Sequence, residues 1–189
     1  MIDKIILYHG SFCIVQVPDL SRCVAGKDFG QGFYLTTSKA QAQKFVATSI
    51  KKAITQKILT TPPSKGYVNA FEFTPSENLS LYEFKNADIP WLHCVVSHRK
   101  QGCIPGEFEK WIGYDLICGK IANDQTNTVI AAFLDGVYGP IDSDRAAELA
   151  ISFLEPENLT NQWCFRSTKA LGCLKFLSAE EVHFHGKQD

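Results

Sequence analysis

The chain has 189 residues, of which 45% are hydrophobic and 21% are charged. These fractions are ordinary for a globular protein and exclude an intrinsically disordered chain, a collagen-like repeat and a simple coiled coil. Lysines and arginines number 19 and aspartates and glutamates 20, so the formal net charge is −1. Proteins that hold nucleic acid mainly by its phosphate backbone are usually far more basic, so nucleic acid is expected only as a local contact.

The seven cysteines predict a reducing compartment. Their number is odd, no two have Cys-x-x-Cys spacing, and most have apolar neighbours, which argues against a zinc ribbon or a thioredoxin-type motif. No secretory signal and no apolar run of membrane-spanning length is visible. The sequence therefore predicts a cytoplasmic protein with free thiols and no membrane contact.

The first part of the chain predicts two strands that lead into a helix. An apolar strand at residues 5–8 is expected to be central in a sheet, and it ends at His9-Gly10-Ser11. Residues 33–36 form a second strand, rich in aromatic and β-branched side chains. Ser38 is a candidate N-cap for an amphipathic helix that ends near residue 57, before two prolines. Phe45 lies at the edge of the apolar face of this helix, which consists of Val46, Ile50, Ile54 and Ile58.

The rest of the chain mixes strands and helices without regular βαβ alternation. This pattern favours an α+β fold over a doubly wound one, in a single domain over residues 1–189. The expected strands are residues 67–73, 79–84, 114–121, 162–165 and 181–185. The expected helices are residues 86–99 with Pro90 in the first turn, 126–134, 143–154, and a short one capped by Ser167.

Several motifs are weak evidence for a function when each is considered alone. Gly30-x-Gly32 lacks the third glycine and the following helix of a dinucleotide site. Asp28-Phe29-Gly30 resembles a kinase triplet but has no Gly-rich loop or strand lysine before it. His183 and His185 alternate on one strand and have no acidic or thiol partner in register, so no metal site is expected.

Four positions taken together are more specific. His9 ends the first strand, Tyr34 follows 25 residues later, Phe45 lies 11 residues beyond Tyr34, and Gln162 begins a late strand. The run from Phe29 to Tyr34 reads Phe-Gly-Gln-Gly-Phe-Tyr. This set resembles the diphtheria-toxin-like ADP-ribosyltransferases, which include the poly(ADP-ribose) polymerases. Their signature of His, Tyr and Glu or a substitute here reads His9, Tyr34 and Gln162. The resemblance implies an ADP-ribosyltransferase-like fold, with two small sheets forming an NAD cleft.

A closer resemblance, over most of the chain, is to a family of uncharacterised bacterial proteins catalogued as a domain of unknown function and grouped with these transferases. Its members often occur beside small partner genes, which implies a toxin–antitoxin role and an antitoxin or immunity protein as partner. The matching stretches are Leu7-Tyr8-His9-Gly10-Ser11, Asp28 to Thr36, Trp91 to Arg99, Tyr114 to Asp124 and Gln162 to Leu171.

The resemblance assigns NAD-binding roles to five residues. Gly10 can offer its backbone N–H and C=O to the nicotinamide carboxamide, because no Cβ blocks the approach. Tyr34 and Phe45 are expected to sandwich the nicotinamide ring. His9 is expected to bind the adenosine ribose, and Ser11 a ribose hydroxyl. NAD is the expected cosubstrate.

Gln162 stands where the polymerases have glutamate. An amide forms hydrogen bonds but does not take up a proton, so chain elongation is not expected. The implied function is mono-ADP-ribosyl transfer to an unidentified protein or nucleic acid. The alternatives are an NAD glycohydrolase and a degenerate NAD- or ADP-ribose-binding module that acts through a partner. Gln162→Glu is expected to retain or raise hydrolysis.

Purely structural interpretations stay open at this point. Tyr34 and Phe45 are then core aromatics, and Gln162 is a sheet-edge amide. Arg99 either meets a pyrophosphate or is a helix-end arginine paired with its neighbours.

Overall fold

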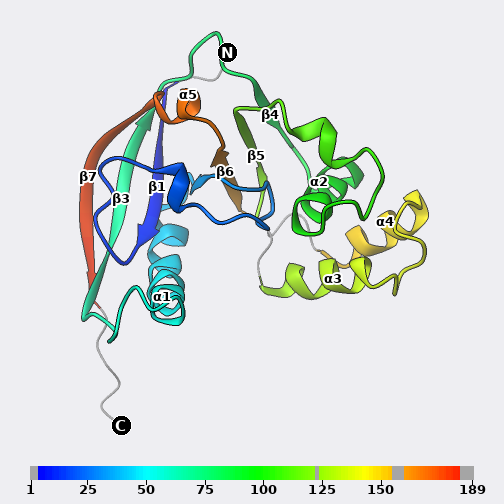
Figure 1. Cartoon of the computed structure of the whole chain (residues 1–189), viewed down its shortest axis with the longest axis horizontal. Coiled ribbons are helices and arrows are strands. Elements are labelled where there is room, and N and C mark those ends of the chain that lie inside the picture. Colours follow the sequence, from blue (N-terminus) through cyan, green and yellow to red (C-terminus); the bar gives the residue numbers. More distant parts are fainter. Residues whose placement is uncertain (1–3, 122–123, 155–159, 184–189) are drawn as a thin grey trace. The chain divides into compact units, whose positions relative to one another are not determined.

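A computed structural model describes residues 4–121, 124–154 and 160–183 of the chain (Figure 1). The chain divides into two compact units, and each combines segments that lie far apart in the sequence. A single domain over residues 1–189 stays a prediction. The first unit comprises Met1–Pro18, Tyr34–Glu77 and Leu171–Asp189, and the second comprises Asp19–Phe33 and Asn78–Ala170.

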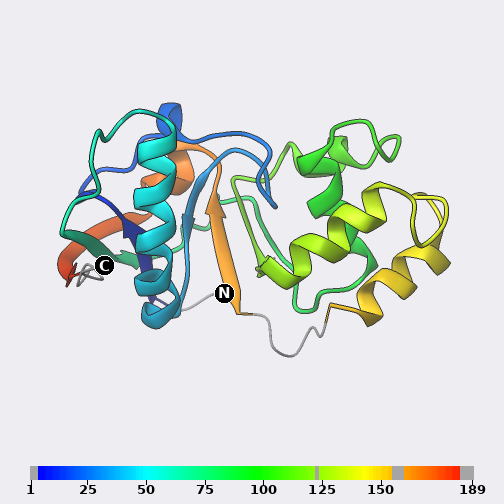
Figure 2. The ribbon, with the colours of Figure 1, turned by 90° about the horizontal axis from the view of Figure 1, so that it is seen from below.

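The first unit is a three-stranded antiparallel sheet covered by one helix (Figure 2). Its strand order is β1-β3-β7, and β1 pairs with β3 from Ile5 opposite Phe73 to Ser11 opposite Tyr67. Helix α1 packs on the sheet through a core of Ala42, Val46, Ile50 and Val68. The elements are β1 (Ile5–Ser11), α1 (Lys39–Thr55), β3 (Lys65–Phe73) and β7 (Leu174–His183).

Helix α1 begins and ends as its local sequence dictates. The Ser38 hydroxyl oxygen accepts a hydrogen bond from the Gln41 N–H at 3.2 Å, which confirms the expected N-cap. Lys57 closes the helix with φ 58°, and the Ile58 N–H returns to the Ala53 carbonyl at 2.8 Å. Because the helix stops there, Ile58 is 59% exposed, and its assignment to the buried face was wrong.

The second unit combines a sheet with several helices. The strand order is β2-β6-β5-β4, in which β4 and β5 are parallel and β5 and β6 are antiparallel. The α2 helix packs with α3 and α4. The strands are β2 (Phe33–Leu35), where the chain passes between the units, β4 (Leu81–Glu83), β5 (Leu116–Lys120) and β6 (Asn161–Phe165). The helices are η1 (Leu20–Arg22), α2 (Ile89–Arg99), η2 (Phe108–Trp111), α3 (Asp124–Leu134), α4 (Asp144–Ser152) and α5 (Thr168–Leu171).

The mixed strands and helices confirm the α+β class. Two strand expectations were wrong in detail. β1 lies at an edge of its sheet instead of the centre, because the central position belongs to β3. β7 begins at Leu174 rather than at residue 181. The sequence did not reveal the first part of this strand, because its buried and exposed residues do not alternate regularly. His185, the last residue of the expected strand, lies outside the described residues. Within the described ranges, no helix is long and apolar enough to cross a membrane.

All seven cysteines are free thiols in the structure. We expect thiol titration of the denatured, non-reduced protein to find all seven. In the native protein the buried Cys94, Cys118 and Cys164 should react slowly, because burial raises the pKa of Cys118 to about 12 and also raises that of Cys94. Two or more cysteines that react only after reduction would contradict the expectation of a reducing compartment.

His93 on α2 carries a buried ring nitrogen, Nε2, that has no hydrogen-bond partner among the described residues. Its ring stacks on Phe133 with centroids 6.5 Å apart. An unsatisfied buried polar atom costs about 1–3 kcal/mol. We therefore expect His93→Phe to raise the free energy of unfolding by about 1 kcal/mol at pH 7.

The same substitution should reduce the acid sensitivity of the fold. Burial lowers the pKa of His9, His93 and His98 below the usual 6.5. Between pH 6.5 and the lower folded pKa values, the unfolded chain binds more protons, so stability is complete above this window and falls as the pH drops through it. Urea midpoints measured from pH 7.5 to 5 should fall in the wild type and fall less in His93→Phe. Equal slopes in both proteins would contradict the burial of His93.

Candidate functional site

At the end of β1, the backbone groups of the buried Gly10 have no hydrogen-bond partner among the described residues. Tyr8 and Thr36 exchange two backbone hydrogen bonds, of 2.8 and 2.9 Å, so the Tyr8 backbone groups point away from β3. In an antiparallel ladder, every second residue directs its N–H and C=O to the same edge. The Gly10 groups therefore point away from β3 as well, and no hydrogen bond reaches them from the described part of the chain.

The His9 side chain links β1 to β2 at the point where the two strands separate. The Tyr8–Thr36 register would place Tyr34 opposite Gly10, but the pairing stops at that one bridge. Instead, His9 Nδ1 lies 2.8 Å from the Tyr34 carbonyl oxygen. A carbonyl only accepts, so Nδ1 carries the proton, and burial lowers the pKa of His9 so that the ring is neutral near pH 7. Nε2 is then a hydrogen-bond acceptor.

The corner after β1 is held by Asn69, which is fully buried on β3 opposite His9. Its Nδ2 donates to the carbonyls of His9 and Cys13, each at 3.3 Å, and its Oδ1 accepts from the Val15 N–H at 2.9 Å. Sequence reasoning missed Asn69. The signal was a lone amide within the otherwise mostly apolar strand Tyr67–Phe73.

Helix α1 approaches Gly10 closely. A Cβ at Gly10 would lie 2.0 Å from the Ala42 carbonyl oxygen and 3.2 Å from the Val46 nitrogen. Gly10 therefore contacts the turn of α1 that carries Phe45. The Phe45 side chain is 41% exposed, and the Lys52 ammonium lies 5.0 Å from its ring centroid. Phe45 is thus not a core aromatic.

Ser11 is buried, with 4% of its surface exposed. Its hydroxyl oxygen accepts a hydrogen bond from the Cys13 N–H at 3.4 Å, which closes the turn after β1. Its expected contact with a ribose hydroxyl stays a prediction.

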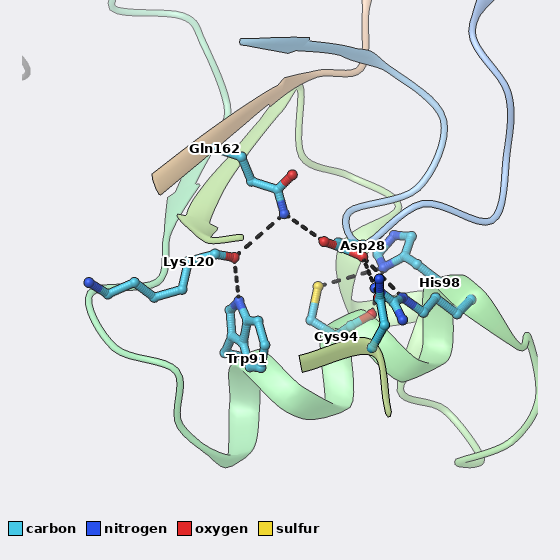
Figure 3. A network of polar contacts seen from close by, with 8 residues as sticks. Asp28, Trp91, Cys94, His98, Lys120 and Gln162 are labelled. Atoms are coloured by element: carbon cyan, nitrogen blue, oxygen red, sulfur yellow. Dashed lines mark hydrogen bonds and ion pairs between the residues drawn. The ribbon is translucent and has the colours of Figure 1, made fainter. Parts of the chain in front are cut away.

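Gln162 lies in the second unit, on β6 opposite Gly119 of β5. Only 6% of its surface is exposed. Its Nε2 donates to Asp28 Oδ2 at 2.8 Å and lies 3.5 Å from the Lys120 carbonyl, which also accepts from Trp91 Nε1 at 3.0 Å (Figure 3). The amide oxygen points away from Asp28 (Figure 3). Gln162 is therefore an interior amide, not one at a sheet edge.

Asp28 organises this network. Its carboxylate accepts hydrogen bonds from Arg99 Nε at 3.0 Å and Arg99 Nη2 at 2.5 Å, as well as from Gln162. Arg99 also donates to Asn127 Oδ1 at 2.7 Å. Arg99 is the last residue of α2, as expected, but the expectation that it pairs with its sequence neighbours was wrong, because its ionic partner Asp28 lies 71 residues away in the sequence. Sequence reasoning noted Asp28 within a rejected kinase-like triplet and at the start of a stretch matching the family, and missed this role.

The contact with Asp28 argues against the expected result for Gln162→Glu. A carboxylate at residue 162 would face the Asp28 carboxylate and the Lys120 carbonyl, with no donor between them. Like charges at this distance repel strongly when they are buried. The structure therefore leads us to expect that the substitution lowers both activity and stability.

The glycines of the Phe-Gly-Gln-Gly-Phe-Tyr run fit close packing within the second unit. Gly30 has φ +83°, and a Cβ there would lie 2.6 Å from the His98 ring. A Cβ at Gly32 would lie 2.5 Å from Cys164 Sγ. Phe29 is fully buried and stacks on Phe84 with centroids 5.8 Å apart. The run therefore fixes the loop that presents Asp28.

A family model described as "Protein of unknown function (DUF3990)" matches residues 5–176, which include every candidate site residue named above. The chain belongs to the DUF3990 family. This confirms the expected membership in a family of proteins of unknown function. A search of curated proteins finds no match to this DUF3990 chain.

The candidate residues of this DUF3990 protein fall into two sets. His9, Gly10, Ser11, Tyr34 and Phe45 belong to the first unit, and Gln162 belongs to the second, with Asp28. Over the described part of the chain, no group of three His, Cys, Asp or Glu side chains has metal-binding geometry.

Proposed function

We propose that this DUF3990 protein is an NAD-dependent mono-ADP-ribosyltransferase with a fold of the diphtheria-toxin and poly(ADP-ribose) polymerase type. The observation that carries the proposal is the Gly10 backbone edge, buried and without a hydrogen-bond partner among the described residues, beside the His9–Tyr34 hydrogen bond. In this proposal the first unit binds nicotinamide through that edge.

The Gly10 edge is complementary to the carboxamide of nicotinamide. One extended residue presents one N–H donor and one C=O acceptor on the same edge, and a carboxamide presents the matching acceptor and donor. The missing Cβ lets α1 lie against this backbone, so the turn that carries Phe45 lies next to it. Tyr34 is half-buried and Phe45 is 41% exposed, so both rings have surface available for stacking.

His9 supplies a polar contact for the ribose. The hydrogen bond from Nδ1 to the Tyr34 carbonyl fixes the tautomer, and the lowered pKa keeps the ring neutral. Nε2 then accepts from a hydroxyl, as a sugar requires. Protonation of His9 would remove this acceptor, so NAD⁺ binding should weaken under acidic conditions.

The reaction breaks the bond between the ribose C1′ and the nicotinamide nitrogen. The bonding electrons leave with nicotinamide, the ribose becomes oxocarbenium-like, and a nucleophile of the acceptor attacks C1′ and releases its proton. The resemblance gives Gln162 the position of the glutamate. The Asp28 carboxylate holds the amide nitrogen, so the amide oxygen is the atom that can accept a hydrogen bond from the substrate. An amide takes up no proton at neutral pH, so single transfer is proposed instead of chain growth.

Phe45→Ala tests the stacking role. Because the side chain is 41% exposed, we expect the fold to persist and NAD⁺ affinity to fall by about tenfold, the effect of roughly 1.4 kcal/mol of lost stacking and burial. Isothermal titration calorimetry measures the affinity and circular dichroism the fold. Phe153→Ala removes another exposed phenylalanine, 56% exposed, in the second unit and should bind NAD⁺ as the wild type does. Unchanged affinity in Phe45→Ala would contradict the assignment.

A mass-spectrometric search for ADP-ribose adducts identifies the acceptor and separates the alternatives. Lysate treated with the protein and NAD⁺ should contain mono-ADP-ribosylated protein or nucleic acid. Nicotinamide release without adducts would indicate a glycohydrolase, and binding without release would indicate a degenerate module. Growth arrest on expression that Tyr34→Ala abolishes would support a toxin-type role and an antitoxin partner.

A further inference from the structure

The second unit contains a cavity of about 570 Å³. It lies between the loop that carries Gly30, the end of α2, the η2 segment and the residues that follow β6. Its volume falls within the range of roughly 300–1,000 Å³ typical of small-molecule sites. The lining residues that matter here are His98, Arg99, Phe108, Tyr114, Asp115 and Arg166.

Arg166 brings a positive charge to this cavity. Nη1 donates to the Trp111 carbonyl, and Nη2 lies 3.4 Å from His98 Nε2. His98 Nδ1 donates to the Cys94 carbonyl at 2.8 Å, and burial lowers the pKa of His98, so the imidazole is a neutral acceptor for Arg166. No carboxylate of the described residues lies within ion-pair distance of Arg166, although the residue is half-buried.

The other charges at the cavity already have partners. Arg99 pairs with Asp28 at 2.5 Å, and Asp115 pairs with Lys169 at 3.0 Å. Asp115 also accepts from the Ser167 hydroxyl at 2.7 Å and from the Ser80 N–H at 3.0 Å. Arg166 is therefore the surplus positive charge. Charges removed from water are normally compensated by a counter-charge, so this site favours an anion.

The side chains that line the cavity indicate which chemical group of the ligand accompanies the anion. Phe108 and Tyr114 are half-buried aromatic side chains, and Ile112 at the rim is 59% exposed. Gly26 and Gly113 also line the cavity, and nothing lies within 4 Å of the place where their Cβ atoms would stand. Backbone without side chains allows a close approach by a bulky anion. Aromatic walls favour a planar ring.

We propose that this cavity binds a phosphate monoester that carries a planar ring, with the phosphate on Arg166 and the ring against Phe108 and Tyr114. The guanidinium fork suits phosphate oxygens, and a phosphate offers three terminal oxygens to donors from several directions. The proposal concerns the second unit alone and does not depend on NAD⁺ binding by the first.

Calorimetric titration of the full chain with phenyl phosphate and with inorganic phosphate tests the proposal. Phenyl phosphate lacks the carboxamide and the riboses that the proposed nicotinamide site of the first unit recognises, and Tyr34→Ala reports any binding at that site. We expect it to bind at least tenfold more tightly than inorganic phosphate and to compete with it. Arg166→Gln should weaken phenyl phosphate at least tenfold. Arg145→Gln, which removes an exposed arginine elsewhere in the unit, should have no effect.

Two rim variants keep the test decisive if Arg166→Gln fails to fold. Ile112 is exposed, so Ile112→Glu and Ile112→Lys should both fold. Ile112→Glu should weaken phenyl phosphate binding several-fold, and Ile112→Lys should strengthen it, by the sign of the added charge. Tyr34→Ala should leave this binding unchanged. The proposal is overturned if phenyl phosphate does not bind, binds no better than inorganic phosphate, is insensitive to both rim variants, or is lost in Tyr34→Ala.

Discussion

Replacing Gln162 by alanine is expected to slow nicotinamide release from NAD⁺ by about 10²–10³-fold, the effect of removing one preorganised hydrogen bond that acts in the transition state. NAD⁺ affinity should change little, because catalysis depends on contacts that strengthen in the transition state. The amide is held in place by Asp28 at 2.8 Å and is buried, so its orientation is fixed before substrate arrives. Nicotinamide release and NAD⁺ binding measured side by side test both parts.

A charge swap serves as the control for Gln162. Gln162→Glu places a carboxylate against the Asp28 carboxylate and should lower both activity and stability. In the double variant Asp28→Asn with Gln162→Glu, the new amide at residue 28 can donate to the new carboxylate at residue 162, which reverses the direction of the wild-type hydrogen bond. The double variant should therefore recover part of the lost stability. If Gln162→Ala cleaves NAD⁺ at the wild-type rate, Gln162 has no role in the reaction.

Gly10→Ala is expected to destabilise the fold by about 3 kcal/mol or more, at the upper end of the cost of overpacking. The added Cβ would lie 2.0 Å from the Ala42 carbonyl oxygen, a backbone atom of α1 that moves only if the helix moves. Either β1 and α1 separate or the corner at His9 is distorted. Equilibrium urea unfolding measures the change.

Gly113→Ala is the matched control for Gly10→Ala. Nothing lies within 4 Å of a Cβ at Gly113, so its substitution should change the free energy of unfolding by no more than about 0.5 kcal/mol. Wild-type stability in Gly10→Ala would show that the β1 backbone does not contact α1 as described.

Local sequence signals predicted the helices near the candidate site. Ser38 caps α1 as expected, whereas the cap of α2, the Asp88 side chain that accepts from the Trp91 N–H at 3.1 Å, was not among the predictions. Pro90 falls in the first turn of α2, where its missing N–H costs nothing. Each signal acts within a few residues, so it can be read from one stretch of sequence.

Long-range contacts could not be predicted in the same way. An apolar run of four residues at 5–8 suits a central or an edge strand, and only the pairing with β3 decides between them. The apolar flanks of Gln162 indicated a strand, but its partner Asp28 lies 134 residues away. Asn69 gave a visible signal, yet the carbonyls that it binds belong to the corner after β1, 56 and 60 residues away.

Nicotinamide release by the purified full-length protein, compared with Tyr34→Ala, tests the central claim most directly. Tyr34 is half-buried, and its carbonyl, which binds His9, is kept in the variant. The account predicts that the wild type binds NAD⁺ and releases nicotinamide, and that Tyr34→Ala folds but loses both. Absence of NAD⁺ binding and cleavage in the wild type, or equal activity in Tyr34→Ala, would contradict the assignment of this corner as the nicotinamide site.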